Sequence, residues 1–199
     1  GFPALVPMPD PAPHEGLHCT FCGSLYPALR EPNFALALFA ALNDPDLTLT
    51  MAGRGWKPFS AATKAAGQVL GSRLVLPGPL PPAEAAALEQ DADVLLNLGN
   101  TRDEQMPSKL FAFLGSGKPI LHLAASDSDP LLPFLASYPL ALVLRQKDGV
   151  TPETVEALRS WLAQTRGKRI PYAEAAALYP DYTPDVTAQK LVNGMEESL

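Results

Sequence analysis

A hydroxyl and an ammonium stand next to each other at the start of an apolar helical stretch. They belong to Ser108 and Lys109 in "QMPSKLFAFLGSGKPIL", which runs from Gln105 to Leu121. Pro107 suits the first turn of a helix, where its missing N–H is no loss, and glycine followed by Pro119 ends the helix before the next apolar run. Free backbone N–H groups and the helix dipole at such a start favour an anion such as phosphate. The stretch therefore predicts an anion site at the start of a helix.

Three loops that follow apolar runs carry the other candidate residues. "GSLYPALREP" follows the first run, "GRGW" the second and "GNTRDEQMPSK" the fourth. In a parallel sheet, ligands bind outside the carboxyl ends of the strands, so these loops are expected to converge. Taken singly, each glycine is better explained as an ordinary turn, and a lone Arg or Lys as a solvated surface charge. The length of the third loop favours a functional interpretation.

The elements that must position these loops alternate along the chain. Short continuous apolar runs begin near residues 17, 47, 74, 94, 120 and 140, and amphipathic or Ala-rich helical stretches separate them. Continuous apolar strands are typical of parallel sheets that are covered on both faces. The sequence predicts an α/β fold, a doubly wound, mostly parallel sheet with helices on both faces. Thr151 is expected to cap the helix that follows the last strand.

Composition restricts the partners of this chain. It has 199 residues, 47% of them hydrophobic, and a net charge of −6. These values fit one sizeable domain, and the negative charge argues against a nucleic-acid partner, which requires clustered Lys and Arg. No apolar run approaches the roughly 20 residues that span a bilayer. We expect a soluble, cytoplasmic domain.

Several familiar catalytic and metal-binding motifs are missing. The chain has no GxxxxGK[ST], no GxGxxG at its first helix and no GxSxG. The two cysteines, Cys19 and Cys22, lie in an apolar, β-prone stretch and are expected to be buried structural thiols. His14 and His18 have no obvious third ligand. We therefore expect neither a metal nor a cofactor.

Four segments in order carry a resemblance to a known family. "FCGSLYPALREP", "LTLTMAGRG", "VLPGPLPPAEAAALEQDADVLLNLGN" and "QMPSKLFAFLGSGKPIL" resemble the C-terminal, nucleotide-sugar-binding domain of GT-B glycosyltransferases, specifically the retaining family four, group 1. The similarity covers about Leu17 to Leu123. The "GN....Q.PSK.F.....GKPI" pattern looks like the subgroup acting on bacterial surface polysaccharides. The resemblance implies transfer of a sugar from a nucleotide diphosphate sugar to a glycan or lipid-linked acceptor.

The resemblance also implies roles for individual residues. Glu104 occupies the first acidic position of the family's paired-glutamate motif and would face the donor sugar, while Arg30 and Lys109 would contact the diphosphate. Fixed N–H dipoles and such cations stabilise the charge that a leaving nucleoside diphosphate gains, without a metal. The second acidic position falls on Ala112, which cannot accept hydrogen bonds from the ribose. The remaining substrate-binding residues expected are Gly23, Ser24, Gly53, Gly55, Asn100, Gln105, Pro107 and Ser108.

The expected domain organisation has three parts. Residues 1–16 are predicted to be a linker from an N-terminal acceptor-binding domain outside this chain, 17–167 the Rossmann-like domain, and 168–199 a tail with a crossing helix. The domain alone is expected to be inactive, and the whole enzyme to lie at the inner face of the membrane through the other domain. Two alternatives stay open: a degenerate, non-catalytic GT-B-like module, which Ala112 favours, and a nucleotide-sugar epimerase-type enzyme.

Overall fold

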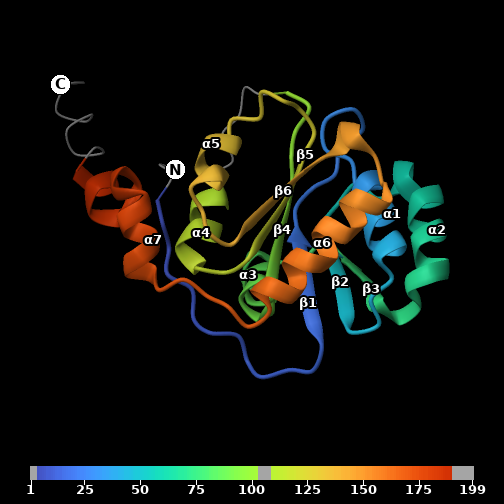
Figure 1. Ribbon diagram of the computed structural model, residues 1–199, viewed down its shortest axis with the longest axis horizontal. Coiled ribbons are helices and arrows are strands. Elements are labelled where there is room, and N and C mark those ends of the chain that lie inside the picture. Colours follow the sequence, from blue (N-terminus) through green and yellow to red (C-terminus); the bar gives the residue numbers. More distant parts are fainter. Residues whose placement is uncertain (1–3, 103–108, 190–199) are drawn as a thin grey trace.

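A computed structural model describes residues 4–102 and 109–189 of the chain (Figure 1). Its centre is one six-stranded sheet in the order β3-β2-β1-β4-β5-β6, and every pair of neighbouring strands is parallel. This confirms the predicted doubly wound α/β fold. The strands are β1 (Leu17–Cys22), β2 (Leu47–Ala52), β3 (Leu74–Gly78), β4 (Val94–Leu98), β5 (Ile120–Ala124) and β6 (Ala141–Arg145).

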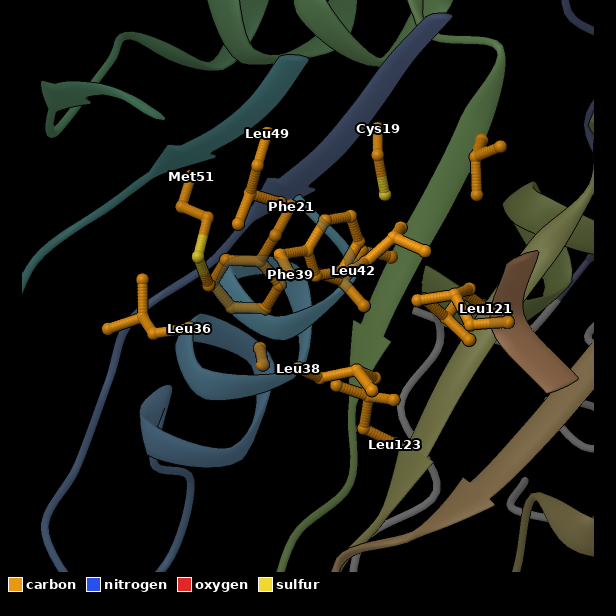
Figure 2. Packing of buried hydrophobic residues seen from close by; sticks show 14 of the residues in the cluster. Cys19, Phe21, Leu36, Leu38, Phe39, Leu42, Leu49, Met51, Leu121 and Leu123 are labelled. Carbon is orange, nitrogen blue, oxygen red and sulfur yellow. The ribbon is translucent and has the colours of Figure 1, made fainter. Parts of the chain in front are cut away.

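Helices cover both faces of the sheet. Side chains of α1 and α6 share one apolar core with the sheet, and those of α4 and α5 share a second core with the other face. Figure 2 shows the first core, in which Phe39 and Leu42 of α1 lie over Phe21 and Leu49 of the sheet. The helices are α1 (Asn33–Leu42), α2 (Ser60–Leu70), α3 (Pro82–Asp91), α4 (Lys109–Ser116), α5 (Leu132–Ala136), α6 (Pro152–Thr165) and α7 (Tyr172–Leu178).

Alternation along the central strands explains why their sequences are largely apolar. On β4, Val94 and Leu96 belong to the first core, whereas Leu95 between them belongs to the second. On β5, Leu121 belongs to the first core and Ile120 to the second. Successive side chains of a strand point to opposite faces, so a strand buried on both faces needs apolar residues throughout.

The register of the sheet places two of the candidate loops next to each other. β1 and β2 pair without a shift from Leu17↔Leu47 to Cys22↔Ala52. The hydrogen bonding continues beyond the strands, because Gly23 N donates to the carbonyl of Ala52 at 2.9 Å. The loops that begin at Gly23 and Gly53 therefore leave the sheet together at its carboxyl edge.

The turn before β5 holds the end of α3. α4 ends at Ser116, and Lys118, whose residue surface is only 2% exposed, directs its ammonium at the last carbonyls of α3. Nζ donates to the carbonyls of Glu89 at 3.0 Å, of Ala92 at 2.7 Å and of Gln90. A cation suits this position because the carbonyls at a helix C-terminus lack partners within the helix.

The N-terminal segment packs against the tail of the chain. Leu5 is fully buried, and its N–H donates to the carbonyl of Tyr182 at 2.7 Å. The Arg169 guanidinium donates to the carbonyls of Met8 and Pro9 and pairs with Asp10. Figure 1 shows the two segments running side by side, and residues 184–189 are helical. The described part of the predicted linker is therefore fixed to the domain.

Candidate functional site

A cavity of about 230 Å³ lies at the carboxyl edge of the sheet, and we call it the β1–β2 cavity. It opens between the loops that follow β1, β2 and β3 and the start of α4. The first two of the three loops predicted to converge therefore meet here with Lys109, the last residue of the third, whose residues 103–108 lie outside the described residues. Its lining consists of Cys22, Gly23, Ser24, Ala52, Gly53, Arg54, Pro79, Leu80, Ala85 and Lys109.

Two glycines are required by the contact between the first two loops. Gly53 has φ +146°, and a Cβ there would lie 1.7 Å from the carbonyl oxygen of Gly23. Gly55 has φ +93°, and a Cβ there would lie 2.2 Å from the carbonyl oxygen of Leu25. A side chain at either position would be both strained and obstructed. Close packing of backbone on backbone thus explains both glycines, and it also brings main chain to the cavity wall.

Lys109, the first residue of α4, is held in place by two acceptors. Its Nζ donates to the carbonyl of Cys22 at 2.6 Å and lies 2.5 Å from Glu89 Oε1 in an ion pair. The ammonium also stands 5.7 Å from the centre of the Phe113 ring. Burial raises the pKa of Glu89, and the neighbouring Lys109 opposes that shift. The predicted phosphate-binding lysine therefore reaches the cavity wall, but it already has a buried carboxylate as its partner.

Glu89 was not among the residues expected from the sequence. It lies on α3 in an Ala-rich stretch, where a glutamate is usually solvent-facing. No helical pattern marked it, because alanines lie on every side of α3 and Glu89 is the only residue of that helix that is buried. A buried carboxylate needs a cationic partner, and the sequence did not indicate one.

Cys22 and Cys19 are buried free thiols, as predicted. Cys22 lies at the end of β1, where its Sγ is 3.7 Å from the carbonyl of Ala85. Burial, reinforced by the Glu89 carboxylate, raises the pKa of the Cys22 thiol to about 12. A thiol that stays protonated is a poor nucleophile.

Arg30 connects the first loop to the loop after β4. Its Nε donates to Asn100 Oδ1 at 2.9 Å, and its Nη1 lies 3.5 Å from the carbonyl of Ser24. Burial lowers the pKa of Arg30. Arg30 is not among the described residues that line the β1–β2 cavity, whereas Arg54, which was not expected, is. The structure thus brings Arg30, Asn100 and Ser24 together beside the cavity.

The rest of the predicted set lies on the third loop. Glu104, Gln105, Pro107 and Ser108 fall outside the described residues. Ala112 is described: it lies on α4, three residues after Lys109 and on the same side of the helix, and it is partly exposed. A longer side chain at Ala112 would therefore have room on the face that carries Lys109.

A buried polar network lies under the loop after β4. His122 is fully buried; its Nδ1 is 2.8 Å from Asn97 Nδ2 and its Nε2 is 3.1 Å from Asp129 Oδ2. Burial alone would raise the pKa of Asp129, but hydrogen bonds from His122 and from the N–H of Leu131 hold it below its ordinary value. Both ring nitrogens of His122 are occupied, so this histidine is a structural support.

The other two histidines, His14 and His18, stack on each other before and at the start of β1. The rings of His14 and His18 stack with centroids 4.0 Å apart, and His14 Nε2 lies 3.6 Å from Asp93 Oδ2. Within residues 4–102 and 109–189 there is no group of three or more His, Cys, Asp or Glu side chains that could hold a metal ion. In the same part of the chain, no helix has the length and apolar character of a membrane-spanning segment.

Comparisons with known proteins identify the fold. No protein-family model matches the chain, and no curated protein matches it significantly. Solved structures do. The pneumococcal O-GlcNAc transferase GtfA, in complex with UDP and GlcNAc, has a TM-score of 0.69 at 13% identity over 98% of this chain. Anabaena HepE, in complex with UDP and glucose, has a TM-score of 0.64 at 14% identity over 93%.

This chain has the fold of a GT-B glycosyltransferase domain. The expectation drawn from the four ordered segments is confirmed at the level of fold. A Listeria monocytogenes protein classed as a UDP-N-acetylglucosamine 2-epimerase shares the fold too, with a TM-score of 0.55 at 15% identity over 92% of this chain. The chain spans 49% of HepE, 38% of GtfA and 45% of the Listeria protein.

Proposed function

We propose that this chain is the donor-binding domain of a retaining glycosyltransferase, which transfers a sugar from a nucleotide diphosphate sugar to a glycan or lipid-linked acceptor. The observation that carries the proposal is the β1–β2 cavity, where two glycine loops and Lys109 meet at the carboxyl edge of the sheet. This is the edge where open α/β sheets bind their ligands. HepE and GtfA, which share the fold, were both solved with UDP.

The chemistry follows from the charges on the cavity wall. Lys109 and Arg54, two cationic residues, line the cavity. When the sugar leaves, the nucleoside diphosphate gains negative charge, and fixed cations stabilise that charge more strongly in the transition state than in the ground state. Arg30, beside Ser24, would support the same step. In the proposal Glu104 faces the donor sugar, and no metal or cofactor takes part.

The proposal includes a second domain. The fold is shared with about half, or less, of each longer glycosyltransferase chain. We assign acceptor binding to an N-terminal domain that precedes residue 1, with residues 1–16 as the connection and 168–199 as the tail that crosses back to it. The assembled enzyme would act in bacterial surface polysaccharide synthesis, in the cytoplasm at the inner face of the membrane.

Two other functions have some support. Ala112 favours a non-catalytic GT-B-like module. In the glycosyltransferase family that this sequence resembles, an acidic residue at this position binds the ribose, and alanine cannot accept those hydrogen bonds. The Listeria protein favours an epimerase-type enzyme. An epimerase needs acid and base groups at its substrate, and His122, near the same edge of the sheet, is fully buried and paired through both ring nitrogens. The glycosyltransferase function therefore fits the described residues better than the epimerase function.

Calorimetric titration with UDP, GDP, ADP and dTDP tests the proposal. We expect one of them to bind selectively, and Lys109→Ala to weaken that binding by about 1.5–3 kcal/mol, the contribution of a charge-assisted hydrogen bond. Lys64→Ala, which removes an exposed lysine of α2, is the matched control and should leave the affinity unchanged. Silence from all four nucleotides would support the non-catalytic module instead.

A further inference from the structure

The Glu89 carboxylate forms an ion pair with Lys109, the only lysine among the described residues that line the β1–β2 cavity. Three titratable groups act on it: Lys109 of α4, Cys22 at the end of β1, and Lys118 before β5. Of these, the Lys118 ammonium already donates to three main-chain carbonyls, and the Cys22 thiol is neutral because burial raises its pKa. Lys109 is therefore the direct counter-ion of Glu89.

This arrangement keeps Lys109 where it is. The Glu89 side chain is only 11% exposed, and apart from the ion pair its Oε1 has no hydrogen-bond partner in the described part of the chain. A buried carboxylate without its counter-ion is strongly unfavourable, so Lys109 should stay with Glu89 when a ligand binds. An ammonium has three N–H donors. Cys22 O and Glu89 occupy two sides of this one, which leaves one N–H for a further acceptor, and the Lys109 side chain is 39% exposed.

Building on the proposed function, we propose that Glu89 is a positioning residue for the diphosphate: it fixes the Lys109 ammonium against the Cys22 carbonyl, and its negative charge limits how tightly the cavity holds the nucleotide. The Lys109 ammonium thereby has a fixed position at the cavity wall, and the Glu89 carboxylate neutralises most of its charge. A diphosphate can then bind through directed contacts and still be released after transfer of the sugar.

The size of the effect follows from the ion pair. A phosphate oxygen that accepts from the exposed side of the ammonium would stand about 5 Å from the carboxylate, given a usual N–H···O length. At an effective dielectric constant of about 20, repulsion between unit charges over that distance corresponds to roughly a two-hundredfold weaker Kd. Screening by salt and water at the open side of the cavity reduces this to about tenfold to a hundredfold. Removing the charge while keeping the side chain should recover that factor.

Glu89→Gln makes this change, because the amide keeps the length and an oxygen for Lys109. We expect its Kd for the nucleotide that the wild type prefers to fall about tenfold to a hundredfold. Glu89→Ala, which also removes the support of Lys109, should not gain this affinity. Glu174→Gln, at an exposed position on α7, is the matched control and should bind like the wild type.

A proton count supplies an independent readout on the wild-type protein. Burial already raises the pKa of Glu89, and an arriving dianion should raise it further, so that Glu89 takes up a proton on binding. Titration with UDP-glucose at a series of pH values from about 4.5, the ordinary pKa of a glutamate, up to neutral, in buffers of different ionisation enthalpy, measures this uptake. We expect uptake by the wild type and less by Glu89→Gln. A purely structural role for Glu89 would not change the proton count.

The outcomes separate this inference from the proposed function. If no nucleoside diphosphate or UDP-glucose binds to the wild type or to Glu89→Gln, the proposed function fails. If the wild type binds but Glu89→Gln binds no more tightly, the role of Glu89 is refuted and the donor site stands. If Glu89→Gln does not fold, the wild-type measurement decides: binding without proton uptake at any pH of the series refutes the inference.

Discussion

Lys118→Met should lower the free energy of unfolding by about 2–4 kcal/mol. In the folded protein the ammonium donates to three carbonyls at the end of α3, and each charge-assisted hydrogen bond contributes about 1.5–3 kcal/mol. Two effects reduce the sum. Methionine no longer has to bury a charge, and a cavity of about 300 Å³ that Lys118 lines lets water reach the freed carbonyls. Methionine keeps an apolar stem of similar length, so packing changes little.

Urea unfolding followed by circular dichroism measures this loss. In thermal unfolding, each kcal/mol corresponds to about 2–4 °C in Tm for a domain of this size, so a decrease in Tm of roughly 4–16 °C is expected. The matched control is Lys64→Met, an exposed position on α2, which should leave the midpoint unchanged. If the two variants unfolded at the same urea concentration, the three hydrogen bonds would not stabilise the end of α3, and the reasoning would be refuted.

Four further predictions follow from the same structure. Burial lowers the pKa of Lys118 to about 8, so between pH 8 and about 10.5 residue 118 binds more protons in the unfolded chain than in the folded protein. The stability of the wild type relative to Lys118→Met should therefore rise over this range, and urea unfolding at pH 8 and pH 10 checks this. Gly53→Ala would place Cβ 1.7 Å from a carbonyl oxygen and should lower the free energy of unfolding by more than about 3 kcal/mol. A loss below about 1 kcal/mol in urea unfolding would contradict this. Ala112→Glu should tighten nucleotide binding by about 1.5–3 kcal/mol if ribose lies there, and calorimetry with no change would remove Ala112 from the site. Thr151→Ala should cost about 0.5–2 kcal/mol in urea unfolding, because Thr151 forms a capping box with the start of α6; full stability would show that the cap is dispensable.

Much of the fold could be predicted because its causes are local. Strands buried on both faces are largely apolar, and this pattern in 94–98 and 120–124 indicated a parallel sheet before any contact was known, whereas 47–52 alternates apolar residues with threonine. Thr151 followed by Pro152 marked the start of α6 for the same kind of reason. Parallel strands also place the loops after them at one edge, so the meeting of the Gly23 and Gly53 loops was predictable.

Only the tertiary structure decided which charged side chains meet. The Lys109–Glu89 pair joins two helices, and Arg30 reaches Asn100 across 70 positions of sequence. The Ala-rich sequence of α3 does not show which face is packed, and the partner of its buried carboxylate depends on how α3 and α4 sit on the sheet. The sequence by itself determined the elements and the edge of the sheet where a site would form. The packing of distant elements determined that Lys109 faces the cavity with Glu89 behind it, because electrostatic pairing depends on distance in space and not on spacing along the chain.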